Sequence, residues 1–258
     1  MSHKMGLKSS RMTVAQREAL AIEVLAKLQA RFPLVRIEKL KDVAEKASFS
    51  SLELVMGVAP DSTTFNSVKD QVLKDICTGQ SASTDTRLYL EHGEFQIEVL
   101  FVEPAHVDMA VDYESYQELG RLISKSVHVQ GMSLSHKGLF YRVRAGSRMV
   151  ADIELANSWS HALSILGYSH ARWEQGFKSL EDVFAFVASS PVFLPSCFAV
   201  KPSEPGSRQA LRFVFADWLE KHSVVDSKVD PLTWLFERVQ GFELRYNTIQ
   251  AADKKRYG

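Results

Sequence analysis

The sequence predicts an α+β fold, in which a mixed sheet flanked by helices is followed by an α-helical C-terminal subdomain. Apolar residues at helical spacing follow the capping-box pair Thr13 and Gln16, and this pattern ends at Pro33. From about Asn157 onward the pattern is helical. Three strand-like segments rich in apolar residues occur before residue 105, at 52–58, 87–90 and 95–102.

The first half of the chain alternates between the two kinds of element. We expect a short strand at 34–37, a helix at 66–77 and a polar loop at 78–84. The segments 87–90 and 95–102 flank His92-Gly93, which predicts a hairpin.

The second half begins with a single expected helix from about 107 to 129. A second hairpin follows at 138–143 and 149–154, turning at 145–147. The segment 201–207, rich in proline, serine and glycine, is the best linker candidate. Amphipathic helices around 208–222 and 231–240 close the chain, and Lys254–Arg256 is expected to be a disordered basic tail.

The composition, 45% hydrophobic and 24% charged, is that of an ordinary globular protein. Net charge is zero, from 31 basic and 31 acidic residues, so no overall field attracts nucleic acid or membrane. No apolar run approaches the roughly 18–20 residues that span a bilayer, and we expect no membrane partner. Cys77 and Cys197 are interpreted as isolated thiols, which favours a cytoplasmic location.

Two acidic residues on predicted strands are candidates for metal chemistry. Alternate residues of a strand point to one face, so Ser51 and Glu53 share a face. Glu98 lies on the face of Gln96 and Leu100, opposite Phe95, Ile97, Val99 and Phe101. If these strands are neighbours in one sheet, Glu53 and Glu98 could hold Mg²⁺ or Mn²⁺ between them.

Two segments carry a resemblance to a known family. Residues 46–53 read Lys46-Ala-Ser-Phe-Ser-Ser-Leu-Glu53 and look like the family's Lys-Glu-Ser-Phe-Gly-Asp-Leu-Asp. Residues 96–102 read Gln96-Ile-Glu-Val-Leu-Phe-Val102 and look like Gln-Val-Asp-Leu-Ile-Phe-Val. The chain therefore resembles the polymerase-beta-like nucleotidyltransferase superfamily, and its helical tail at Gly176–Pro191 looks like the phage-encoded group of that superfamily. The match covers roughly residues 13–145.

This resemblance implies an organisation and a set of site residues. It implies a nucleotidyltransferase-like core at 13–104, a helix plus hairpin extension at 105–157 and a helical C-terminal subdomain at 158–258. Ser51, Glu53 and Glu98 stand at the family's three catalytic carboxylate positions, with Glu53 and Glu98 as the metal ligands.

The chain also departs from the family's pattern. Ser51 replaces an aspartate, and Leu40-Lys41 stands where a Gly-Ser pair is expected to approach the triphosphate. The two metal ions of such a site need accurately placed carboxylates that neutralise part of their charge. Misplacement of the reacting groups by about 1 Å can lower the rate about a hundredfold. We therefore expect an impaired or inactive site that holds no metal, in a phage protein with a nucleic-acid-binding or assembly role.

Two alternatives stay open. The chain could be an active enzyme that uses Mg²⁺ or Mn²⁺ to transfer a nucleoside monophosphate from a nucleoside triphosphate. It could instead be a structural protein that forms homo-oligomers, or binds a viral or host protein, through its aromatic-rich helical half. In either case the location would be the host cytoplasm if the chain is phage-encoded.

Arginines of the second hairpin are the candidate nucleic-acid-binding residues. Arg142 and Arg144 would share one face, with Arg148 beyond the turn and aromatic residues interleaved. This composition suits a phosphate backbone with a stacked base. The alternative is a solvated hairpin face with core aromatics.

Overall fold

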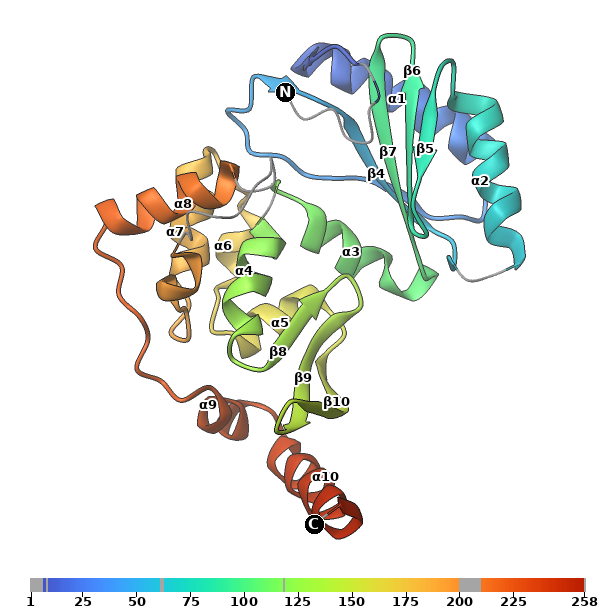
Figure 1. Ribbon diagram of the computed structural model, residues 1–258. Coiled ribbons are helices and arrows are strands. Elements are labelled where there is room, and N and C mark those ends of the chain that lie inside the picture. The colour runs from blue at the N-terminus through green and yellow to red at the C-terminus, as the bar shows by residue number, and fades with distance from the viewer. Residues whose placement is uncertain (1–6, 8, 61–62, 118, 200–209, 258) are drawn as a thin grey trace. The chain divides into compact units, whose positions relative to one another are not determined.

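The computed structural model describes residue 7 and residues 9–60, 63–117, 119–199 and 210–257 (Figure 1). The chain forms two compact units, unit 1 (residues 1–112) and unit 2 (residues 113–258). It is an α+β protein, with a mixed sheet flanked by helices and further helices towards the C-terminus, as predicted. The expected linker, 201–207, lies outside the described residues. None of the described helices is long and apolar enough to cross a membrane.

Unit 1 is built on a five-stranded sheet of order β2-β4-β7-β6-β5. The central strands β4 and β7 are parallel, and the other neighbours are antiparallel. The strands are β2 (Ile37–Lys39), β4 (Leu52–Gly57), β5 (Ser81–Ser83), β6 (Arg87–His92) and β7 (Phe95–Val102). A separate two-stranded pair joins β1 (Met12–Thr13) to β3 (Ser48–Phe49). The expected first hairpin is confirmed, with its turn at Gly93-Glu94.

One face of this sheet packs against α1 (Val14–Arg31) and α2 (Thr63–Ile76). Alternate strand residues such as Leu54, Ile97 and Val99 supply the sheet side of this core. The helix that begins after Thr13 is confirmed, because the Thr13 side chain accepts from the Gln16 backbone and the Gln16 side chain accepts from the Thr13 backbone.

The opposite face is covered at one end by the segment after β7. A short 3₁₀ turn, η2 (Pro104–His106), leads into α3 (Val107–Glu114). Val107 and Ala110 of α3 pack with Val55, Leu100 and Val102 of the sheet. Positions further back along β4 and β7 on this face carry Glu53, Gln96 and Glu98.

The prediction of a single helix over 107–129 is wrong, because the helix ends after α3 and a second helix follows. Tyr116 and Gln117 have positive φ angles of 56° and 66°, which end a right-handed helix. A new helix, α4 (Leu119–His128), starts after this break. Gly120 is required there, since a Cβ at this position would lie 2.1 Å from the Tyr113 carbonyl oxygen.

Unit 2 contains a three-stranded antiparallel sheet of order β10-β9-β8. The expected second hairpin is confirmed as β9 (Gly138–Ala145) and β10 (Arg148–Ala156). The additional strand, β8 (Met132–Ser135), pairs with β9 and was not expected. Its alternating Met132 and Leu134 are buried, so a weak signal was present in a very short segment.

The other elements of unit 2 that the structure describes are helices, and several contribute to an aromatic core that includes Trp159, Trp173 and Phe186. The expected disordered tail at Lys254–Arg256 is wrong, because these residues belong to the last helix. The elements are α5 (Trp159–Ile165), α6 (His170–Glu174), α7 (Leu180–Ala188), η3 (Pro195–Phe198), α8 (Ala210–Lys221), α9 (Pro231–Arg238) and α10 (Phe242–Tyr257).

Two expectations in unit 1 also need correction. The strand expected at 34–37 begins only at Ile37, since Pro33 and Leu34 form a turn in which Leu34 is 98% exposed. The polar loop expected at 78–84 contains β5, which pairs with β6 at the edge of the sheet. An edge strand made of serine and alanine has no apolar alternation to reveal it.

Candidate functional site

The structure brings Glu53 and Glu98 together on one face of the central parallel pair. Glu53 of β4 is the direct register partner of Glu98 of β7. Side chains at directly paired positions of neighbouring strands point to the same face, so the two carboxylates lie side by side. The expectation that these strands are neighbours in one sheet is confirmed.

Glu98 is deeply buried and has a cationic partner. Its side chain is 3% exposed, and one of its oxygens forms an ion pair with Nη1 of Arg87, whose side chain is 18% exposed. Arg87 belongs to β6, which flanks β7 on the side away from β4. Its register partner is Leu100, so it lies diagonally across from Glu98 on the same face.

Arg87 was not among the residues singled out in the sequence, although a signal existed. Once the hairpin turn is placed at Gly93-Glu94, pairing His92 with Phe95 puts Tyr89 opposite Glu98. Arg87, two residues from Tyr89, then shares its face. Strand register alone therefore brings a positive charge to Glu98.

Ser51 is buried but lies just before the first residue of β4. Strand alternation therefore does not fix its direction relative to Glu53. A serine hydroxyl is a neutral ligand, so it adds no negative charge to the pair. The three positions implied by the resemblance thus contribute two carboxylates.

Leu40 and Lys41 stand where the resemblance implies a Gly-Ser pair, and the side chain of Leu40 is packed in the protein interior. Leu40 is buried against Val55 and Leu100, and its backbone N–H donates to the Glu53 carbonyl oxygen over 3.2 Å. Lys41 pairs with Asp112 over 3.1 Å. This backbone N–H is engaged within the protein, and the leucine side chain occupies space that a glycine would leave open.

These donors do not fit a two-metal centre. Such a centre holds two ions about 3.5–4 Å apart, and Mg²⁺ requires near-octahedral oxygen ligands at about 2.0–2.1 Å. Within the described part of the chain, no group of three or more His, Cys, Asp or Glu side chains could hold a metal ion. One of the two carboxylates is already paired with Arg87.

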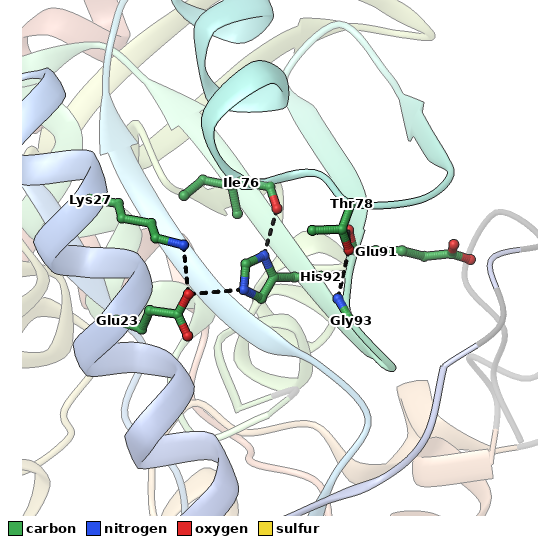
Figure 2. Close-up of polar contacts among 7 residues, drawn as sticks. All are labelled: Glu23, Lys27, Ile76, Thr78, Glu91, His92 and Gly93. Carbon is green, nitrogen blue, oxygen red and sulfur yellow. Dashed lines mark hydrogen bonds and ion pairs between the residues drawn. The ribbon is translucent and has the colours of Figure 1, made fainter.

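A second polar cluster lies where the β6–β7 hairpin meets α1 and α2 (Figure 2). His92 places Nδ1 2.6 Å from the Ile76 carbonyl oxygen at the end of α2, and Nε2 3.2 Å from the Glu23 carboxylate. Lys27 donates to the same carboxylate over 2.6 Å, and this hydrogen bond is the main cause of a lowered Glu23 pKa. The Thr78 hydroxyl accepts from the Gly93 backbone over 2.7 Å. These hydrogen bonds connect α1, the end of α2 and the β6–β7 hairpin.

The arginines of the β9–β10 hairpin all have partners within the protein. Arg142 donates to the Ser133 hydroxyl over 2.9 Å, and Arg144 donates to the Ser147 carbonyl oxygen over 3.2 Å. Arg148 pairs with Asp253 of α10. Arg142 is half-buried, whereas Arg144 and Arg148 are exposed.

The aromatic residues beside these arginines differ in their surroundings. Tyr141 packs edge-on against Phe242 and Tyr246 of α10, and burial raises the pKa of its hydroxyl. Phe140 is half-buried. Tyr141 therefore belongs to a packed cluster, and Arg144 is the group on this hairpin best placed to meet a ligand from solvent.

Comparison with family models and with curated proteins gives no match for this chain. The class that the structure defines is an α+β protein whose mixed sheet places two carboxylates side by side at its centre. The resemblance to nucleotidyltransferases stays a prediction that rests on the segments 46–53 and 96–102.

Proposed function

We propose that this chain is a nucleotidyltransferase-like protein of phage type with an inactive metal site. The protein would then act in the host cytoplasm by binding nucleic acid, or by binding other proteins that take part in replication, transcription or assembly. The paired positions of Glu53 and Glu98 on two parallel strands support the kinship.

The observation that carries the inactive assignment is the ion pair that Arg87 forms with the buried carboxylate of Glu98. A divalent ion and a guanidinium group compete for the same carboxylate. An ion that binds here must displace Arg87 from Glu98 and leave the partly buried guanidinium without its carboxylate, which is unfavourable. The packed Leu40 and the neutral Ser51 add to this deficit.

A transfer assay tests this proposal. The wild-type chain would be incubated with each NTP and dNTP, with Mg²⁺ or Mn²⁺, and with nucleic acid, protein or water as acceptor. We expect no product above the level of the Glu53→Ala variant. Turnover that Glu53→Ala abolishes would establish the active alternative, in which Glu53 and Glu98 share an ion.

Nucleic-acid binding is tested separately on the hairpin. If Arg144 contacts a phosphate, Arg144→Ala should weaken binding of a labelled single-stranded oligonucleotide and lower the salt slope by about 1. Arg31→Ala, which changes an exposed arginine at the end of α1 in unit 1, is the control. If Arg144→Ala leaves oligonucleotide binding unchanged, the hairpin does not bind nucleic acid, and the result favours the protein-assembly role.

One observation favours the oligomer alternative. A groove of about 720 Å³ lies between η3, α8 and the segment 223–226. Its lining is mainly apolar, with Phe213 and Val225 exposed, and the acidic residues Asp217, Glu220 and Asp226 contribute to it.

The occupant that we propose for this groove is α10 of a second copy, because its exposed face combines Leu244 with Lys254 and Lys255. Light scattering of the wild type, the Glu220→Lys variant and a Glu220→Lys/Lys255→Glu variant would test this. If α10 of a second copy occupies the groove, we expect the wild type to associate. The Glu220→Lys variant should lose this association, and the Glu220→Lys/Lys255→Glu variant should recover part of it. A wild type that is monomeric at high concentration excludes the alternative.

A further inference from the structure

We infer that the Arg87 guanidinium is a built-in cation that takes the electrostatic place of a metal ion at the Glu53–Glu98 pair, and that Arg87 keeps divalent ions out of this site. The inference rests on the proposed function, because it assigns a cause to the inactive site. It also predicts that Glu53 and Glu98, which do not make up a two-metal centre, can hold a single divalent ion once Arg87 is removed.

The first step is the charge balance of the sheet. Neighbouring strands lie about 4.8 Å apart, and like charges directly opposite each other destabilise a sheet. Glu53 and Glu98 occupy such directly opposite positions at the centre of unit 1. A positive charge nearby therefore offsets the repulsion between the two carboxylates.

The second step is the position of Arg87. It reaches Glu98 from β6, diagonally across the same face, and both side chains are largely withdrawn from water. Electrostatic interactions are stronger in such surroundings than at the surface. Arginine suits this position because its planar guanidinium keeps its charge when buried and presents several donors to carboxylate oxygens.

The third step is competition. A divalent ion bound to Glu98 would lie within a few ångströms of the guanidinium, and two cations at that distance repel strongly in a poorly hydrated site. To bind, the ion must displace Arg87 and leave a partly buried arginine without its carboxylate. Removal of Arg87 eliminates both obstacles and leaves the two carboxylates in place.

The test uses full-length Arg87→Met, which keeps most of the side-chain volume and removes the charge. Mn²⁺ binding would be followed by the loss of the free-ion electron paramagnetic resonance signal, without nucleotide. We expect the variant to bind Mn²⁺ at least about tenfold more tightly than the wild type, since a positive charge beside the site is gone. Its melting temperature should also rise with Mn²⁺ concentration.

Matched variants locate the ion. Arg87→Met/Glu53→Gln and Arg87→Met/Glu98→Gln should each lose the gained binding, because each lacks one carboxylate. Arg36→Met is the control, since Arg36 is an arginine that pairs with carboxylates, those of Glu38 and Asp108, at an exposed position. This control should bind Mn²⁺ no better than the wild type.

A second variant, Arg87→Gln, guards against failure of Arg87→Met to fold, because glutamine is neutral but can still donate to Glu98. If the folded variants bind Mn²⁺ no better than the wild type, the inference is wrong. Tight Mn²⁺ binding by the wild type would also overturn it. Either failure is distinct from that of the proposed function, which is decided by nucleotide turnover of the wild type.

Discussion

At the scale of single residues, burial decides what a pair of opposite charges does in this protein. Arg36 and Asp108 form an ion pair with 50% and 77% of their side chains exposed. Arg87 and Glu98 form a similar pair with 18% and 3% exposed. Arg36, by its hydrogen bond, lowers the pKa of Asp108, yet water around both groups screens the interaction.

This contrast gives the first prediction. Arg36→Gln should lower the free energy of unfolding by less than about 1 kcal/mol, the usual range for a surface pair. Arg87→Gln should lower it by about 3 kcal/mol, because a buried carboxylate loses its cation. Urea denaturation at pH 7 measures both. Equal losses for the two variants would contradict the distinction that we draw from burial.

Cys197 gives the second prediction. It lies in η3, and burial raises the pKa of its thiol to about 11. Only the thiolate reacts with iodoacetamide, so alkylation of the native protein at pH 8 should be roughly a hundredfold slower than that of a free cysteine. The rate should keep rising by about tenfold per pH unit towards pH 11.

The measurement for Cys197 is mass spectrometry of the Cys197 peptide after timed alkylation. Urea-unfolded protein is the control, since unfolding removes the burial that raises the thiol pKa. A rate that stops rising near pH 9 would show that the thiol has its ordinary acidity.

At the scale of elements, prediction from sequence succeeded where the signal lies in adjacent residues. The helix after Thr13 and the two hairpins were predicted from capping, spacing and turn residues. Prediction from sequence failed where an element depends on contacts with residues that are not its neighbours in the sequence. The helix break at Tyr116 depends on backbone angles and on the close approach of Gly120 to the Tyr113 carbonyl.

The last helix shows the same limit. The apolar residues of α10 do not gather on one face, and it is held by Phe242 and Tyr246 against Tyr141 of β9. Such contacts between distant segments cannot be derived from local spacing. In the candidate site, the neighbourhood of Glu53 and Glu98 was predictable from two short segments, whereas Arg87 required the register of a third strand.

Helix capping gives the third prediction. The Ser179 side chain accepts from the Asp182 backbone at the start of α7, in a complete capping box. Ser158 holds the same position before α5 but makes no capping hydrogen bond with its side chain. Ser179→Ala should cost about 1 kcal/mol of stability and Ser158→Ala only a few tenths. Urea unfolding of unit 2, followed by tryptophan fluorescence, compares them, and a reversed order would refute the assignment.

At the scale of the whole molecule, each unit has a core of its own. Unit 1 is centred on its sheet, where Phe101 packs edge-on against Phe65. Unit 2 is centred on an aromatic cluster in which Trp173 contacts Tyr116 and Phe177. All four tryptophans, at positions 159, 173, 218 and 234, belong to unit 2. Tryptophan fluorescence therefore reports on unit 2 alone, whereas circular dichroism reports on both units.

This distribution gives the fourth prediction, which concerns cooperativity between the units. Phe101→Leu and Trp173→Leu each remove buried volume from one core and should destabilise that unit by about 2 kcal/mol. Because each unit has a core of its own, Phe101→Leu should shift part of the circular dichroism transition and leave the fluorescence midpoint unchanged. Trp173→Leu should shift the fluorescence midpoint, still reported by three tryptophans. If both variants move both signals equally, the units unfold as one cooperative body, and the site in unit 1 would then respond to substitutions throughout unit 2.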